Sequence, residues 1–168
     1  QRIQRLTLAV AADLGKKVRV ETSLAPLDTL PVAFHRLLRE GLPQLVRNAV
    51  AHGIEPGHER LQSGKKAEGS IRIEVRQGEA GILELEVADD GRGIDAGALR
   101  RKLVESGRYQ EHEVAAMAVR DVIATIFQPG MSTSDHVDEH AGRGVGLDVL
   151  HALVKETGAR IKLVSTPL

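Results

Sequence analysis

Two neighbouring segments in which apolar and charged residues alternate place the strongest constraint on the fold of this chain. Residues 71–75 read IRIEV and residues 83–87 read LELEV, so every second side chain is apolar in both. A period of two is typical of strands with one buried face and one solvated face. Because a short stretch with Gly78 and Gly81 joins the segments, the pattern predicts an antiparallel hairpin. Such a hairpin excludes an all-parallel dinucleotide-binding sheet.

Apolar residues recur at helical spacing over much of the remaining sequence. Helices are expected over residues 1–15, 32–52, 96–106, 113–126 and 145–157, and further strands over residues 18–21 and 160–165. Pro43 lies inside the second helix and should bend or restart it, because proline has no backbone N–H to donate. Residues 53–69 are expected to form a loop with solvated basic side chains. These elements predict an α+β fold, a two-layer α/β sandwich in which helices cover one face of a mixed, mostly antiparallel sheet.

Composition excludes several classes of protein. The sequence contains no cysteine, which excludes disulfides and thiolate metal sites and fits a reducing compartment. Lys and Arg together number 23, and so do Asp and Glu, so no basic field indicates nucleic acid. No apolar run reaches the ~20 residues needed to span a bilayer. The length of 168 residues favours one domain, and because the sequence opens on Gln1 rather than Met, we expect a piece of a longer protein.

Three polar motifs are candidates for function. Residues 87–95, VADDGRGID, place two carboxylates at a strand end beside two glycines, which by itself describes an ordinary tight turn. Residues 142–147, GRGVGL, open a helix, where glycines and free N–H groups suit an anion or form a flexible cap. Asn48 stands in a helix four residues after Gln44, among apolar neighbours that indicate burial and a need for hydrogen-bond partners.

Together these motifs match a known family. The stretches LVRNAVAHGIEPGHERLQSGK, VADDGRGID, IFQPGMST and AGRGVGLDVL occur in the order of the asparagine, first glycine, phenylalanine and second glycine boxes of the GHKL ATPases. Over nearly its whole length the sequence resembles the ATP-binding catalytic domain of CheA-like chemotaxis histidine kinases. HGIEP and FQPGMST favour this branch over ordinary sensor kinases. The resemblance implies the GHKL (Bergerat) sandwich over residues 1–168 and the activity of a protein histidine kinase.

The resemblance also implies roles for individual residues. Asp89 would hydrogen-bond the exocyclic amine of adenine, because an ionised carboxylate only accepts hydrogen bonds; Asp90 is interpreted as a turn residue. Asn48 would bind Mg²⁺, and His52 and Lys102 would lie near the phosphates of ATP. Residues 127–144 would form a lid over the nucleotide. The remaining nucleotide contacts would come from Gly91, Gly93, Ile94, Gly142, Arg143, Gly144, Val145, Gly146 and Leu147.

The sequence departs from the CheA pattern at two places. Where that pattern has a histidine implicated in phosphotransfer, this chain has Gln44, whose amide cannot act as a general base. We therefore treat Gln44 and Asn48 together as the candidate catalytic residues. The family usually ends with a further glycine-threonine motif and a last strand, whereas this sequence stops at Leu168.

The implied function is that of an ATP-binding kinase module in a hybrid histidine kinase, which positions Mg-ATP for γ-phosphoryl transfer to a histidine on another domain or protomer. Its partners would be a histidine phosphotransfer domain and a response-regulator receiver domain of the same parent protein. We expect it in the cytoplasm, without nucleic-acid or membrane contact. Two alternatives stay open: a nucleotide-gated pseudokinase, which Gln44 motivates, and a GHKL ATPase of the chaperone, topoisomerase or mismatch-repair type, against which HGIEP and PGMST argue.

Overall fold

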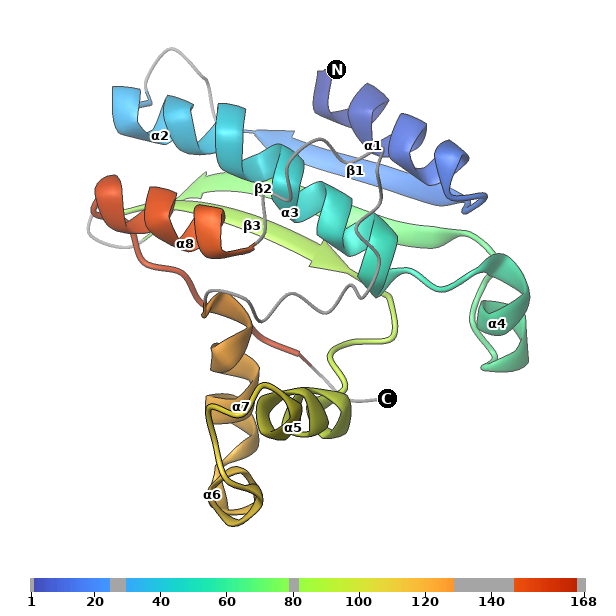
Figure 1. Ribbon diagram of the computed structural model, residues 1–168. Coiled ribbons are helices and arrows are strands. Elements are labelled where there is room, and N and C mark those ends of the chain that lie inside the picture. The colour runs from blue at the N-terminus through green and yellow to red at the C-terminus, as the bar shows by residue number, and fades with distance from the viewer. Residues whose placement is uncertain (1, 25–29, 79–81, 129–146, 166–168) are drawn as a thin grey trace. The chain divides into compact units, whose positions relative to one another are not determined.

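The computed structural model describes residues 2–24, 30–78, 82–128 and 147–165 (Figure 1). The chain forms two compact units, residues 1–93 and residues 94–167, and each is described by itself. Most of the expected lid, residues 129–144, lies outside the described ranges, so the lid and the single domain over residues 1–168 stay predictions. No helix within those ranges is long and apolar enough to cross a membrane.

A three-stranded sheet with β2 in its centre forms one layer of the first unit. β1 (Val18–Leu24) runs parallel to β2 (Gly69–Gln77), and β2 pairs antiparallel with β3 (Leu83–Asp89) (Figure 1). The predicted hairpin and the α+β class with a mixed sheet are therefore confirmed. The register pairs Ile71 with Asp89, which places that carboxylate at the last residue of β3.

The two faces of β2 differ as the alternation predicts, whereas residues 83–88 of β3 are all partly buried. The apolar side chains at alternate positions of β2 are buried. On the opposite face, Arg72 pairs with Glu86 at 2.9 Å and Arg76 with Glu84 at 2.8 Å. Because water and salt screen these exposed ion pairs, burial of the apolar face is the stronger determinant of the strand register.

A helical run from Val32 to Gly53 lies across the buried face of the sheet (Figure 1). Its parts are α2 (Val32–Arg36), η2 (Leu37–Gly41), α3 (Leu42–Asn48) and η3 (Ala49–Gly53). The η parts are wider turns, in which Leu42 N–H donates to the carbonyl five residues earlier. Pro43 is the second residue of α3, two positions after the first wide turn ends at Gly41. The predicted irregularity is therefore present as a local widening, and the helical run continues.

α1 (Arg2–Asp13) packs beside this run on the same side of the sheet (Figure 1). Gly15 adopts a φ of +62° and ends the helix, and Lys16 N–H donates to the Ala11 carbonyl at 2.8 Å. The sheet and the helices bury one apolar core, made of Val10, Ala11, Val18, Leu42, Val46, Ala49, Val50, Ile54, Ile71 and Ile73. This core holds the long helix against the hairpin and so positions the end of each.

Residues 53–69 are not the simple loop that the sequence predicted. Gly57–Gln62 form a short helix, α4. Its apolar residue Leu61 is 62% exposed, whereas its charged residue Arg60 is only 1% exposed. The helix has no apolar periodicity because its buried anchor is a guanidinium, and this is why the sequence pattern did not reveal it.

The second unit consists mainly of helices around a smaller core. Its helices are α5 (Ala96–Glu105), α6 (Glu111–Ala116), α7 (Val119–Ala124), η5 (Thr125–Phe127) and α8 (Leu147–Glu156). Leu99 and Leu103 of α5 pack with Val114 and Val122. The Asp95 carboxylate caps α5 by accepting a hydrogen bond from the Ala98 N–H at 2.9 Å. The helix predicted over residues 96–106 is thus confirmed.

The helix predicted over residues 113–126 is divided into two. Met117 and Ala118 adopt extended backbone angles between α6 and α7. Arg100 of α5 donates hydrogen bonds to the carbonyls of Val114 and Met117. Because the last carbonyls of a helix have no partner within it, this guanidinium stabilises the end of α6. A contact from another helix therefore accompanies the break, and no local proline or glycine marks it.

The strand predicted over residues 160–165 does not form within the described part of the chain. The structure assigns these residues to neither a helix nor a strand. Their contact with the rest of the unit includes a hydrogen bond from Ile94 N–H to Ser165 Oγ at 2.8 Å. Apolar alternation describes what a strand buries, but a strand also needs a partner for its backbone groups.

Replacement of Leu103 by alanine should lower the free energy of unfolding by about 2–5 kcal/mol, because the side chain is fully buried in the second core. The matched control is Val104→Ala, at the next position of α5, where the side chain is 36% exposed. That substitution should change the free energy of unfolding by no more than about 0.5 kcal/mol. Chemical denaturation followed by circular dichroism checks both variants. Equal losses would contradict this assignment of the core.

Candidate functional site

The end of the long helix and the turn after β3 meet at two glycines. A Cβ placed on Gly91 would lie 2.2 Å from the Gly53 carbonyl oxygen, and a Cβ placed on Gly53 would lie 2.8 Å from Asp89 Oδ1. A larger residue at Gly91 would collide with backbone, so the close approach requires glycine there. The Gly53 carbonyl also accepts a hydrogen bond from the Arg92 N–H at 3.0 Å. This contact joins the asparagine-bearing helix to the D-x-G-x-G turn.

Asp89 presents a carboxylate at this junction. Its Oδ1 accepts a hydrogen bond from the Gly91 N–H at 3.0 Å, and its side chain is exposed to solvent. Desolvation by the surrounding protein nevertheless raises the pKa of Asp89, the Gly91 hydrogen bond opposes this rise, and the negative charges of Asp90 and Glu55 add to it. The group is a hydrogen-bond acceptor held against bare backbone, with solvent access for a ligand.

Gln44 and Asn48 lie on one stripe of the long helix, as their spacing predicts. The Gln44 Nε2 donates a hydrogen bond to the Asn48 Oδ1 at 3.2 Å, and both side chains are partly exposed. The contact orients the Asn48 amide. An amide oxygen has a second lone pair, so Asn48 can accept a further interaction.

The last turn of the same helix carries His52 and is capped by a lysine. Lys16 Nζ donates at 2.8 Å to the carbonyls of Val50 and Ala51, which the helix end leaves without partners inside the helix. Burial lowers the pKa of Lys16, and the positive charge of Arg92 contributes in the same direction. His52 is exposed. This lysine holds the backbone immediately before Gly53.

A buried guanidinium connects α4 to the turn after β3. Arg60 donates to Glu55 Oε2 at 2.9 Å, to Asp90 Oδ2 at 2.9 Å, to the Asp90 carbonyl at 3.2 Å and to the Lys66 carbonyl at 2.8 Å. Both Arg60 and Glu55 are buried. Removing one partner of such a buried pair costs about 3–5 kcal/mol, because the other charge is left uncompensated.

Lys65 forms a second connection to the same turn. Its Nζ donates to Glu55 Oε1 at 2.8 Å, to the Asp90 carbonyl at 3.0 Å and to the Gly91 carbonyl at 2.8 Å. Burial opposes ionisation of Glu55, but the hydrogen bonds from Lys65, the backbone and Arg60 outweigh it, and the pKa of this carboxyl is lowered. Glu55 is therefore an ionised centre between two cations.

These contacts correct two interpretations of the sequence. The basic residues of the segment after the long helix are not all solvated, because Arg60 and Lys65 hold the β3 turn. Asp90 is a turn residue, but it also binds Arg60 and accepts a hydrogen bond from the Ser70 N–H at 2.8 Å. The sequence offered one signal for this network, an acidic residue followed at five and ten positions by basic residues, and that signal by itself is weak.

The remaining predicted residues are distributed over the chain. Gly93 has a φ of +69°, a conformation that favours glycine, at the end of the first unit. Ile94 and Lys102 belong to the second unit, where both are partly buried. Leu147 begins α8. Gly142, Arg143, Gly144, Val145 and Gly146 lie outside the described residues.

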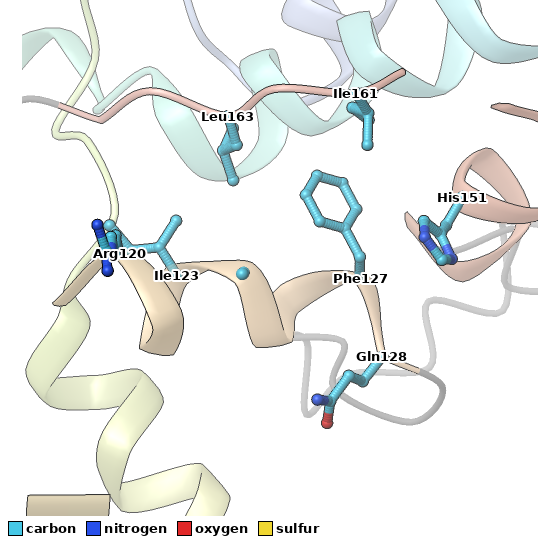
Figure 2. Close-up of a pocket in the computed structure, with 8 residues that line it drawn as sticks. Arg120, Ile123, Phe127, Gln128, His151, Ile161 and Leu163 are labelled. Carbon is cyan, nitrogen blue, oxygen red and sulfur yellow. The ribbon is translucent and has the colours of Figure 1, made fainter. Parts of the chain in front are cut away.

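The second unit contains a pocket of about 400 Å³ between α7, η5, α8 and the extended C-terminal segment. Figure 2 shows Phe127 pointing toward Ile161 and Leu163, with His151 beside it. The Phe127 and His151 rings stack with their centroids 6.1 Å apart. Phe127 and Gln128, the first two residues of the expected lid, line this pocket, but none of the residues expected to contact the nucleotide outside the lid does, so we assign no ligand to it.

Comparison with known proteins decides the family. A family model described as histidine kinase-, DNA gyrase B- and HSP90-like ATPase matches residues 35–168, which include Asn48, Asp89 and the glycines around them. The chain belongs to this ATPase family. The GHKL recognition made from the sequence motifs is confirmed.

The relatives of this chain include a motility regulator, chemotaxis proteins and a sensor histidine kinase. The chain is 42% identical over 128 residues to the gliding motility regulatory protein of Myxococcus xanthus, covering 76% of this chain and 16% of that protein. It is 33% identical over 167 residues to the chemotaxis protein CheA of Rhizobium meliloti, covering 99% of this chain and 22% of that protein. The sensor histidine kinase CheAY of Helicobacter pylori is 30% identical, covering 96% of this chain and 20% of that protein.

The fold comparison agrees with the family assignment. The histidine kinase domain of the blue-light activated histidine kinase from Erythrobacter litoralis EL346 superposes with a TM-score of 0.53 at 15% identity, covering 98% of this chain and 54% of that chain. At this identity the likeness supports the fold alone. In every case the chain spans well under two thirds of the relative, so the activity of a whole parent protein is a matter for proposal.

The opposite environments of Asp89 and Asp95 predict the order in which they take up protons. As the pH falls, Asp89 should become protonated first, because burial raises its pKa. Asp95 should be protonated last, because the N–H of Ala98 at the start of α5 lowers its pKa. Carboxylate carbon chemical shifts measured by NMR across the acidic range report both groups in one sample. The reverse order would contradict the described surroundings of Asp89.

Proposed function

We propose that this chain is the ATP-binding kinase module of a CheA-like hybrid histidine kinase. The observation that carries the proposal is the Asp89 carboxylate, held at the surface against the contact between Gly53 and Gly91. Beside it, Gly53 and Gly91 have no side chains, which leaves room for a planar base to approach closely. A charged acceptor beside bare backbone, in a member of this ATPase family, fits recognition of adenine.

Base selection follows from the chemistry of the carboxylate. An ionised carboxylate accepts hydrogen bonds and donates none, so Asp89 favours the exocyclic amine of adenine over the carbonyl that guanine has at the same place. Because Gly91 N–H already binds Oδ1, the turn holds the carboxylate in one orientation. Gly91, Gly93 and Ile94 follow directly in the sequence and would line the base.

The phosphate side of the nucleotide is assigned to the long helix. Asn48 lies five residues before Gly53, which corresponds to a rise of about 7 Å along a helix axis, so both ends of one nucleotide can contact the same unit. His52 is exposed between them. Lys102 and the second glycine box, Gly142–Leu147 with Arg143 and Val145, would add charge and backbone N–H groups at the phosphates.

The residues present fit a magnesium ion that is held largely by its substrate. The described chain contains no group of three or more His, Asp or Glu that could bind a metal by itself. The Asn48 Oδ1 is a hard oxygen ligand of the type Mg²⁺ accepts, and phosphate oxygens and water would complete the site. When bound, Mg²⁺ supplies charge stabilisation for phosphoryl transfer. Gln44 would keep the Asn48 oxygen oriented.

The transfer partner is assigned from the relatives. CheA-type relatives suggest a histidine phosphotransfer domain that accepts the γ-phosphoryl group and a receiver domain that takes it on, both in the parent protein and in the cytoplasm. The chain's own residues would bind ATP and position it, since these contributions dominate phosphoryl transfer. The acceptor histidine would come from another domain or protomer.

Two substitutions test the assignment of base and metal roles. Asp89→Ala should weaken the binding of adenosine, ADP and ATP alike by about 10-fold or more, with or without magnesium, because the acceptor for the adenine amine is lost. Asn48→Ala should leave adenosine binding nearly unchanged and reduce only the magnesium-dependent part of ATP affinity. Isothermal titration calorimetry, with magnesium and with a chelator, measures the affinity for each nucleotide in the presence and absence of the metal ion. If Asn48→Ala weakened adenosine as much as Mg-ATP, the two residues would not serve opposite ends of one nucleotide.

The hydrogen bond between Gln44 and Asn48 favours a second candidate, a nucleotide-gated pseudokinase. An amide in place of a histidine can orient Asn48 but cannot take up a proton. Another GHKL ATPase is also compatible with the family, whose described members include DNA gyrase B and HSP90. The kinase is preferred because the named relatives include a chemotaxis protein CheA and a sensor histidine kinase.

Gln44→His distinguishes the kinase from the pseudokinase. If the amide has replaced a required base, histidine should raise the rate of phosphoryl transfer to the parent's phosphotransfer domain by about 10-fold or more. Transfer of radiolabelled γ-phosphate measures the rate, and ATP affinity measured in parallel is the control. If the unchanged protein instead transfers phosphate rapidly and the Gln44→His variant transfers it more slowly, Gln44 is the residue that supports transfer and the pseudokinase is excluded.

A further inference from the structure

We infer that Lys65 and Arg60 are positioning residues for base recognition, which hold the turn after β3 so that Asp89 meets the amino group of a purine. The inference rests on the proposed function, because it takes Asp89 as the group that binds the base. Neither cation is assigned a contact with the nucleotide. Their effect is on the place and orientation of the carboxylate.

Three successive residues of the turn after β3, Asp90 to Arg92, are held by contacts with residues 53–70. The Asp90 carboxylate binds Arg60 through Oδ2 and the Ser70 N–H through Oδ1. The Gly91 carbonyl accepts from Lys65 at 2.8 Å. The Arg92 N–H donates to Gly53 at 3.0 Å. An ordinary solvated turn between a strand and a helix would not need these partners.

The burial of the cations shows that the contacts are built into the protein. Arg60 is 1% exposed and the Lys65 side chain is 17% exposed. A buried charge requires several acceptors to replace its lost hydration. Glu55 supplies one carboxylate oxygen to each cation, and the remaining acceptors include the Asp90 and Gly91 carbonyls. Moving the turn would leave both cations short of acceptors.

The same contacts determine where the Asp89 carboxylate lies. Its Oδ1 is bound to the Gly91 N–H, so a displacement of Gly91 displaces the carboxylate. Steric contact with the Gly53 carbonyl prevents a closer approach of Gly91 to the helix. The hydrogen bonds at Asp90, Gly91 and Arg92 prevent the turn from swinging away. Because hydrogen-bond strength falls steeply with distance and angle, this positioning should determine how well Asp89 recognises an amine.

The experiment compares two nucleosides that differ at one group. Adenosine has the exocyclic amine, and purine riboside has hydrogen in its place. In the unchanged chain of residues 1–168, calorimetry should show adenosine binding about 10- to 100-fold more tightly, as expected for a hydrogen bond to a charged acceptor. The ratio of the two affinities reports the contact between Asp89 and the amine, because a general loss of packing would weaken the binding of both nucleosides equally.

Lys65→Met is the decisive variant, with Lys66→Met as its matched control. Methionine keeps the apolar stem and removes the donor to the Asp90 and Gly91 carbonyls, while Arg60 still pairs with Glu55. The adenosine preference should fall by about fivefold or more. The exposed Lys66 contributes its carbonyl to this network, so replacing its side chain should preserve the ratio of the two affinities.

Each outcome decides the inference. If Lys65→Met weakens both nucleosides by the same factor or leaves both unchanged, Lys65 does not position Asp89. If the Lys65→Met variant is unfolded at the titration temperature, the Asp90→Asn variant replaces it. The Asp90 side chain is about half exposed, and its substitution weakens the contact with Arg60. An unchanged ratio of the two affinities in that variant overturns the inference. If the unchanged chain binds both nucleosides equally, the proposed role of Asp89 fails instead.

Discussion

The contact between the backbone at Gly53 and at Gly91 is the constraint on which the candidate site depends. The long helix carries Asn48, β3 carries Asp89, and the two elements approach closely only because neither glycine has a side chain at the junction. A single Cβ at Gly91 would meet backbone, which cannot rotate away as a side chain can. The apolar core beneath brings the helix and hairpin together, and the glycines determine how closely their ends meet.

Around this junction the protein uses buried charge where a core would ordinarily use apolar side chains. Arg60, Glu55 and Lys65 form a network at the edge of the first core. Burying ions is expensive in free energy, and apolar residues of similar volume would often give equal or greater stability. What the ions provide is direction, because each hydrogen bond is made at a particular carbonyl or carboxylate of the β3 turn. That use of charge is consistent with a surface that must hold a ligand acceptor in one place.

Local pattern predicted much of the architecture but less of its detail. Strict alternation over residues 71–75 and 83–87 was sufficient for the hairpin, and helical periodicity was sufficient for the long helix and α5. It failed for α4, whose buried residue is Arg60, and for the helix that is divided at Met117 and Ala118. It also predicted a strand over residues 160–165, where the structure has none. For α4 and for the divided helix, contacts with residues farther along the chain, Asp90 and Arg100, accompany the failure.

The sequence by itself determined the family, the strand-end carboxylate and the helix that presents Asn48, because motif order, periodicity and glycine spacing are properties of neighbouring residues. Only the tertiary structure showed that Gly91 packs on Gly53, that Gln44 orients Asn48, and that Asp90 binds buried Arg60. The physical reason is that a buried cation loses its hydration and needs hydrogen-bond acceptors in its place. Which acceptors it finds depends on what the fold brings near. Among the acceptors of Arg60, Asp90 lies 30 positions along the chain, a separation that no local pattern encodes.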